Sequence, residues 1–289
     1  MKHTPERADN GGAARGTPAV PHAEAPELRR HDGCAARGAP PAADAQAPIH
    51  TRADITARLL ALREPDFQAF QAKLLPSRDP ETVLGVRTPA LRALARELAG
   101  TDAAADFLAA LPHRYFEEDN LHAFLLARIR SYDACISALD AFLPHIDNWA
   151  TCDQLSPGAL GRDLSRLDGD IRRWLASPLP YVQRFGIGMR MRHFLGAAFT
   201  PDSMAEIAAI RSDEYYVNMM IAWYFATALA MQEAAALPYF EAPLLPRFVR
   251  GKAIQKALES RRVSPETKAY LRTRRQQTGG CHERKTFLG

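Results

Sequence analysis

The sequence predicts an all-α protein, built as a right-handed superhelical stack of antiparallel helix pairs, an α-solenoid. Apolar residues recur at helical spacing from Ile55 onward, as they do on the buried face of a helix. Sustained alternation of β-branched and polar residues, which is typical of a half-buried strand, is nearly absent. Short polar breaks divide the chain into many helical runs. Helices joined in this way pack antiparallel, and stacked pairs bury a continuous core.

The expected helices follow from this spacing and from residues that start or stop a helix. The first run covers residues 55–74 and ends at Pro76. The next has Thr88 as its N-cap and Pro89 in the first helical position, and it stops at Gly100. The remaining runs cover 103–111, 117–130, 132–143, the segment around Trp149, 157–167, 171–175, 181–195, 204–210, 215–231, 237–245, 248–262 and 265–275.

The composition divides the chain into three parts. Residues 1–50 are rich in Ala, Pro, Gly and Arg and poor in bulky apolar side chains, so they cannot bury enough surface to offset the entropy of ordering. We expect a disordered extension there. Residues 51–276 are expected to form the helical-repeat domain, and residues 277–289 a flexible tail.

The charge of the chain is uneven. The net charge is +4, but from Gly251 to the end there are ten Lys or Arg residues against three acids. A basic C-terminal segment on a nearly neutral body favours a polyanionic partner. The simpler alternative is a solvated helix followed by a frayed tail.

The cysteines and the hydropathy of the chain indicate which cofactors and which cellular location to expect. The four cysteines, Cys34, Cys135, Cys152 and Cys281, lie far apart with no CxxC pair, which argues against a zinc site and a disulfide framework. We therefore expect no metal or organic cofactor and a reducing, cytoplasmic location. The longest uncharged run, residues 215–232, is shorter than a membrane span needs, and no secretory signal is visible.

An aromatic residue and a carboxylate four positions apart mark the most distinctive stretch. Trp149 and Asp153 lie on one face of a short expected helix. An unpaired buried charge is costly, whereas a carboxylate beside an indole ring suits a cationic ligand. The alternative is that Trp149 is a core residue whose indole N–H finds a carbonyl, with Asp153 capping the next loop.

Two further clusters combine aromatic and charged residues. Tyr181 and Arg184 are three apart and share a helix face, and Tyr216 and Trp223 lie on one helical stripe with Met219 between them. The structural alternatives are that Arg184 pairs with a carboxylate such as Asp170 and that the stripe belongs to the core.

Six segments, in order, resemble a known family. They are Leu84-Gly85-Val86-Arg87-Thr88-Pro89 with Leu91-Arg92, Tyr115-Phe116-Glu117-Glu118, Asp147-Asn148-Trp149-Ala150-Thr151-Cys152-Asp153, Arg184-Phe185-Gly186, Tyr215-Tyr216-Val217-Asn218-Met219 with Ala222-Trp223, and Ala253-Ile254-Gln255-Lys256-Ala257-Leu258-Glu259-Ser260. Together, over about residues 51–275, they are similar to the AlkD-like family of bacterial DNA alkylation repair glycosylases, which are built from HEAT-like repeats.

The resemblance implies a function and a set of site residues. It implies a monofunctional DNA glycosylase that removes cationic N3- or N7-alkylated purines from double-stranded DNA without cutting the strand, acting as a monomer near the nucleoid. Asp153, Trp149 and Trp223 would be catalytic, and Arg184 would hold a phosphate. The further DNA contacts are expected from Tyr181, Tyr216, Lys252, Lys256 and Arg261.

Two other functions remain open from the sequence. The first is a family member that binds DNA structures without excising a base, because the Tyr215–Met219 and Ile254–Ser260 segments resemble a distinct subgroup. The second is a helical-repeat scaffold for protein partners, since solenoid concavities commonly bind proteins.

Overall fold

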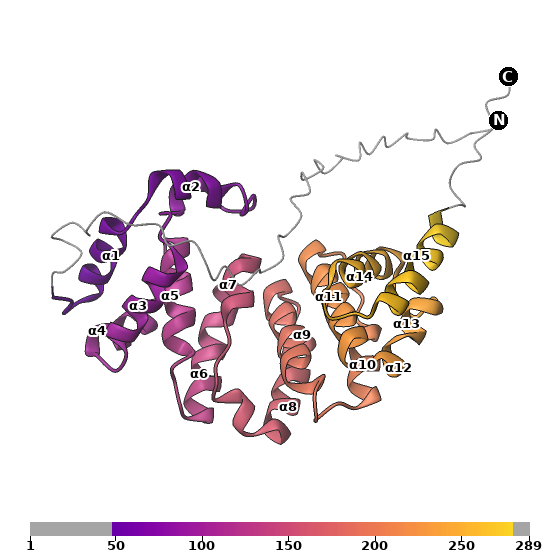
Figure 1. Cartoon of the computed structure of the whole chain (residues 1–289). Coiled ribbons are helices and arrows are strands. Elements are labelled where there is room, and N and C mark those ends of the chain that lie inside the picture. The colour runs from indigo at the N-terminus through magenta and orange to yellow at the C-terminus, as the bar shows by residue number, and fades with distance from the viewer. Residues whose placement is uncertain (1–47, 280–289) are drawn as a thin grey trace, which may run out of the picture. The chain divides into compact units, whose positions relative to one another are not determined.

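The computed structural model describes residues 48–279, and all regular structure within this range is helical (Figure 1). The all-α prediction is confirmed. In chain order the elements are α1 (Arg52–Ala61), α2 (Pro65–Ala72), the 3-10 turn η2 (Pro80–Thr82), α3 (Thr88–Leu98), α4 (Asp102–Ala109), α5 (Phe116–Leu126), α6 (Tyr132–Phe142), η3 (Leu143–His145), α7 (Trp149–Gln154), η4 (Leu160–Arg162), α8 (Leu164–Leu175), α9 (Pro180–Phe194), α10 (Pro201–Ala209), α11 (Tyr215–Met231), α12 (Glu233–Ala236), α13 (Pro238–Glu241), α14 (Arg247–Glu259) and α15 (Pro265–Gly279).

The helices form a packed stack. In what we call the central row, α3, α5, α7, α9, α11 and α14, each helix contacts the next. Helices outside this row pack onto it: α4 and α6 contact α5, α8 and α10 contact α9, and α13 and α15 contact α14. This alternation is the one expected for stacked helix pairs of the HEAT-like kind. Helix α5 contributes apolar side chains to both main core clusters and so joins them.

The expected extension and tail fall almost wholly outside the described residues. Of the predicted extension only residues 48–50 are described, and of the predicted tail only residues 277–279, which belong to α15. Within residues 48–279, no helix has both the length and the apolar character needed to cross a membrane.

The expected run over residues 55–74 is two helices. Pro65 begins α2, and a residue that precedes proline disfavours the helical conformation. Glu64 accordingly has an extended backbone, with φ −123° and ψ 109°. The expected Thr88 cap is also wrong by one residue. Arg87 is the N-cap of α3, but it makes no capping hydrogen bond, and its guanidinium pairs instead with Glu64 at 2.8 Å.

The expected helix over residues 157–167 is wrong. Residues Leu160–Arg162 form a 3-10 turn, and α8 begins only after Asp163, whose carboxylate accepts the Arg166 backbone N–H at 3.1 Å. An aspartate N-cap fixes the residue at which a helix begins. Helix α8 therefore runs without a break from Leu164 to Leu175, and the expected run over 171–175 is its second half. Residues 237–245 hold only the short α13, because Pro238 starts a new helix and α12 ends before it.

Helix α5 is buried along its whole length, including its charged residues. The Glu117 carboxylate accepts the backbone N–H groups of Leu84, Gly85 and Val86 at 2.8, 2.7 and 3.3 Å. Burial raises the pKa of Glu117, and these N–H groups oppose the rise. The loop before α3 is therefore anchored on a buried carboxylate.

Two histidines in the same region share a buried hydrogen bond. The Nε2 of His113 and the Nδ1 of His122 are 2.9 Å apart, and the His122 ring stacks on Phe142 with centroids 3.9 Å apart. Burial lowers the pKa of both histidines, so both are neutral in the folded protein at neutral pH.

This pair predicts a specific pH dependence of stability. A histidine with a lowered folded pKa stabilises the fold above its ordinary pKa of about 6.5, and the contribution falls by about 1.4 kcal/mol per pH unit below it. Replacing His122 with Gln keeps a hydrogen-bonding side chain but removes its titration. We expect the free energy of unfolding to fall less between pH 7 and pH 5 in His122→Gln than in the wild type.

The raised pKa values of Asp119 and Glu117 act in the opposite direction, so the comparison is between variants, by denaturant titration at each pH. Equal losses in the two proteins would contradict the assignment of His122.

Candidate nucleic-acid interface

The predicted acid–aromatic pair lies on α7, a helix of six residues in the central row. Asn148 caps it, accepting the Thr151 backbone N–H at 2.8 Å. The Thr151 hydroxyl donates to Asn120 of α5 at 3.0 Å. An isolated helix this short is not stable in water, so its position depends on such ties to its neighbours.

Trp149 is packed at the start of α7. Its indole N–H donates to the backbone carbonyl of Leu74 at 3.2 Å, and the residue is 9% exposed. The structure thus shows the alternative for Trp149, a core residue whose indole N–H binds a backbone carbonyl. Trp149 does not line the small cavity described below, although it lies on the same short helix as Asp153.

Asp153 and Arg184 form a buried ion pair between α7 and α9. The guanidinium donates through Nε and Nη2 to the two carboxylate oxygens at 2.9 and 2.7 Å, and each side chain is 4% exposed. The remaining Nη1 donates to the backbone carbonyl of Tyr216 on α11. Forked pairing of this kind is the strong form of an arginine–carboxylate contact. The alternative in which Arg184 pairs with a carboxylate is what the structure shows, but the partner is Asp153 and not Asp170, which instead binds Tyr132 and Arg173.

A small cavity brings three of the predicted site residues together. Asp153, Arg184 and Trp223 line it, and its volume is about 20 Å³. Arg192 and Met220 lie on its wall as well. A cavity of this size has room for one water molecule, and the side chains of Asp153, Arg184 and Arg192 supply polar groups in its largely apolar wall. Water beside a carboxylate and an indole is the arrangement that hydrolysis at a cationic centre needs.

Arg192 also lines the cavity, and the sequence analysis did not single it out. It donates to the Leu155 carbonyl at 3.5 Å, a contact at the limit of a hydrogen bond, and its side chain reaches the cavity. The signal was present, because Arg184, Gly188 and Arg192 are spaced four apart and so share one face of α9.

The residues predicted to contact DNA spread along the central row. The rings of Tyr181 on α9 and Tyr216 on α11 have centroids 6.1 Å apart, and both side chains are half-buried. Lys252 and Lys256 lie on α14, the next helix of the row, and are half-buried, while Arg261 is exposed just beyond its end. The structure therefore places Tyr181 and Tyr216 beside the Arg184 contact, and the three basic residues farther along the row.

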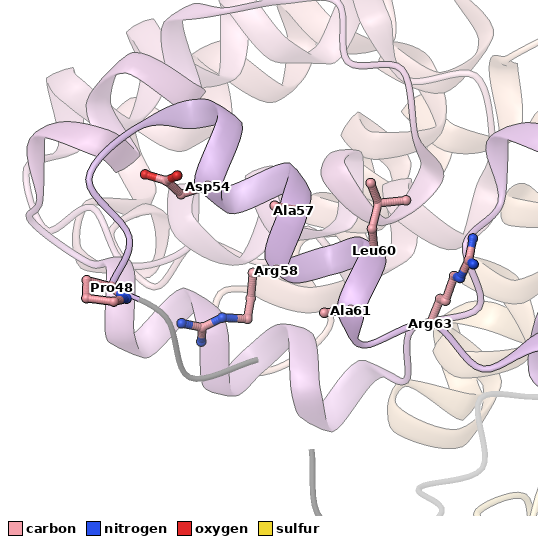
Figure 2. A pocket seen from close by; sticks show the side chains of 7 residues that line it. All are labelled: Pro48, Asp54, Ala57, Arg58, Leu60, Ala61 and Arg63. Carbon is pink, nitrogen blue, oxygen red and sulfur yellow. The ribbon is translucent and has the colours of Figure 1, made fainter. Parts of the chain in front are cut away.

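A larger hollow lies elsewhere, on α1 (Figure 2). Its volume is about 530 Å³, and none of the predicted site residues lines it. Two of its three charged side chains already serve the fold, since Asp54 accepts the Thr51 backbone N–H at 2.8 Å and Arg58 pairs with Glu97 at 3.3 Å. We assign it no part in the site.

The fold and the site define a class, a stacked helical-repeat protein with a buried acid–arginine pair and a tryptophan around a water-sized cavity. The family model described as "DNA alkylation repair enzyme" matches residues 55–256, and no curated protein matches the chain. The chain therefore belongs to the DNA alkylation repair enzyme family. The resemblance in the sequence is confirmed, and the residues around the cavity lie within the matched range.

Proposed function

We propose that this protein is a monofunctional DNA glycosylase that hydrolyses the N-glycosidic bond of N3- and N7-alkylated purines in duplex DNA. The observation that carries the proposal is the cavity, where the Asp153 carboxylate, the Trp223 indole and room for one water meet. The family match supports DNA alkylation repair as the setting.

The chemistry follows from the charge of the substrate. A purine alkylated at N3 or N7 is a cation, and breaking the bond from C1′ to the base nitrogen returns the bonding electron pair to the base, which leaves neutral. The sugar becomes oxocarbenium-like, as in other glycosyl transfers. Little acid catalysis of the leaving group is needed, so the protein has to stabilise positive charge and position water.

Each site residue has its own role in this reaction. Asp153 stabilises the developing cation and orients the water, whose oxygen adds to C1′ and whose proton passes to the carboxylate. Trp223, which lines the cavity, presents its ring to the sugar or the cationic nucleotide. Trp149 is 9% exposed at the start of α7 and presents only that exposed part of its ring. Arg184 supplies the counter-charge of Asp153. A contact from Arg184 to a flanking phosphate requires Nη1 to exchange its bond to the Tyr216 carbonyl for one to the phosphate. Within residues 48–279 no lysine lines the cavity to form a Schiff base, so we expect the strand to stay intact.

The remaining contacts are with the duplex backbone. Tyr181, Tyr216, Lys252, Lys256 and Arg261 track the phosphates along the central row. The protein acts as a monomer beside the nucleoid in the cytoplasm, where buried free thiols such as those of Cys135 and Cys152 stay reduced.

The test is incubation with duplex DNA containing N7-methylguanine. The proposal requires release of the free base and an abasic product that breaks only after alkali treatment. Salt-sensitive DNA binding without base release would identify a non-catalytic DNA-binding protein instead. Neither release nor binding would leave a protein-binding scaffold.

The backbone contacts predict a salt dependence. Each phosphate contact contributes about 0.9 to the slope of log affinity against log salt concentration. Replacing both Lys252 and Arg261 with Gln should therefore reduce the slope by roughly 1.8, while the rate of base release at saturating DNA stays unchanged. Fluorescence anisotropy across a salt series measures the slope.

The control is Arg173→Gln on α8, a helix outside the central row, where the Arg173 side chain is 50% exposed and pairs with Asp140 and Asp170. A slope altered equally by the control and the test variant would count against the placement of the DNA on this row.

A further inference from the structure

The segment between α2 and α3 carries one buried arginine at the centre of several contacts. Arg78 donates through Nη1 to Asp119 at 2.7 Å and to Asp147 at 3.0 Å. Its Nη2 donates to the Arg114 carbonyl at 3.2 Å and its Nε to the Thr82 hydroxyl at 3.2 Å. The Arg78 side chain is only 8% exposed. Each nitrogen of the guanidinium is thus used within the protein.

These contacts lead to the start of α7. Asp147 accepts from the side-chain amide of Asn148 at 3.0 Å, and Asn148 is the residue that caps α7. Four residues before Arg78, the Leu74 carbonyl accepts the Trp149 indole N–H. One short segment therefore holds both Asn148, at the cap, and Trp149, at the first helical position.

The other ties of α7 are made along its length. Thr151 bonds to Asn120 of α5, and Asp153 pairs with Arg184 of α9. Because α7 has six residues, none of them lies far from an end, and a shift at its start moves Asp153 relative to the cavity. A displacement of about 1 Å in a reacting group can cost roughly 100-fold in rate.

The contacts between Arg78 and the two carboxylates depend on the guanidinium group of arginine. Asp119 is buried on α5, Asp147 is exposed, and both accept from the same guanidinium nitrogen, Nη1. Burial raises the pKa of Asp119 to about 7, and Arg78 opposes that rise. Nη1 holds both carboxylates, while Nη2 and Nε reach the Arg114 carbonyl and the Thr82 hydroxyl. A lysine ammonium has three donors on a single nitrogen and cannot make all four bonds in this geometry.

We propose that Arg78 is a positioning residue of the site: by joining Asp119 of α5 to Asp147 it sets where α7, and with it Trp149 and Asp153, lies in the central row. The proposal rests on the proposed glycosylase function. Arg78 itself touches no substrate.

The first test is Arg78→Lys, which keeps the charge and loses the fork. We expect kcat for base release to fall at least tenfold, while KM for methylated duplex DNA stays within twofold because no DNA contact is removed. The matched control is Arg190→Lys. Arg190 is 1% exposed and pairs with Asp168 and Glu206, but its contacts lie on α8 and α10 and not on α7. We expect the control to lower Tm without lowering kcat.

The second test measures how firmly α7 is held in place and does not depend on catalysis. Hydrogen exchange measured by mass spectrometry should be faster in the peptide covering residues 147–155 of Arg78→Lys, and unchanged in peptides covering α14. Equal losses of kcat in both lysine variants, or unchanged exchange at α7, would overturn the proposal. If the wild type releases no base, the glycosylase assignment fails, and the exchange result alone decides whether Arg78 positions α7.

Discussion

Asp153→Asn should lose base release from N7-methylguanine DNA by about 100- to 1000-fold, the loss typical when one charge-stabilising group is removed from a preformed site. Asparagine keeps the shape of the side chain but removes the negative charge that would face the developing sugar cation. It also leaves the buried guanidinium of Arg184 without its counter-charge. Loss of one partner from a buried ion pair costs about 3 to 5 kcal/mol, so the variant should also unfold more easily.

The control separates chemistry from stability. Glu206→Gln removes the charge of a carboxylate from another ion pair with a buried arginine, Arg190, and neither residue of that pair lines the α7 cavity. Single-turnover base release is measured well below the melting temperature of both variants. A loss in Asp153→Asn no larger than the loss in Glu206→Gln would refute the catalytic assignment of Asp153.

Gly85→Ala should destabilise the protein by about 3 kcal/mol or more, because strain and a steric clash act together. Gly85 has φ +80°, and a Cβ placed there would lie 2.5 Å from the Gln68 backbone nitrogen and 2.6 Å from the Glu64 carbonyl oxygen. Those neighbours are backbone atoms and cannot rotate away. The same residue donates its N–H to the buried Glu117 carboxylate at 2.7 Å, so any shift weakens that anchor.

Gly100 offers a matched comparison for this effect. Its φ is +86°, but a Cβ there would meet nothing within 4 Å. Gly100→Ala should therefore carry only the cost of the backbone conformation, about 1 kcal/mol. Denaturant titration of both variants gives the difference. Equal losses would show that the close approach of α2 to Gly85 is not what requires glycine.

Most of the fold was predictable because helical periodicity is a local property. The expected run over residues 215–231 coincides with α11, which is strongly apolar and bounded by polar residues. The errors arose where one side chain decides a boundary. Pro65 divides the first run, and Asp163 delays α8, since a cap acts through a single hydrogen bond that periodicity does not register.

Three of the residues expected from the sequence, Asp153, Arg184 and Trp223, line one cavity, but the pairings between residues could not be predicted. Asp153 and Arg184 are 31 residues apart in sequence and meet only because α7 and α9 are adjacent in the central row. The indole of Trp149 finds its carbonyl 75 residues away, at Leu74. Helical spacing relates residues three or four positions apart and cannot predict contacts between residues so far apart in sequence. The role of Arg78 was invisible for the same reason, because its partners lie on α5 and before α7.

The most direct test of the central claim compares a cationic and a neutral base under identical conditions. Duplexes of the same sequence, one with N7-methylguanine and one with uracil, are incubated with the wild-type protein in single-turnover experiments. A site that acts by stabilising positive charge should release N7-methylguanine at least about 100-fold faster than uracil, a difference of about 2.7 kcal/mol in barrier. Equal release of both bases, or release of neither, would contradict the account.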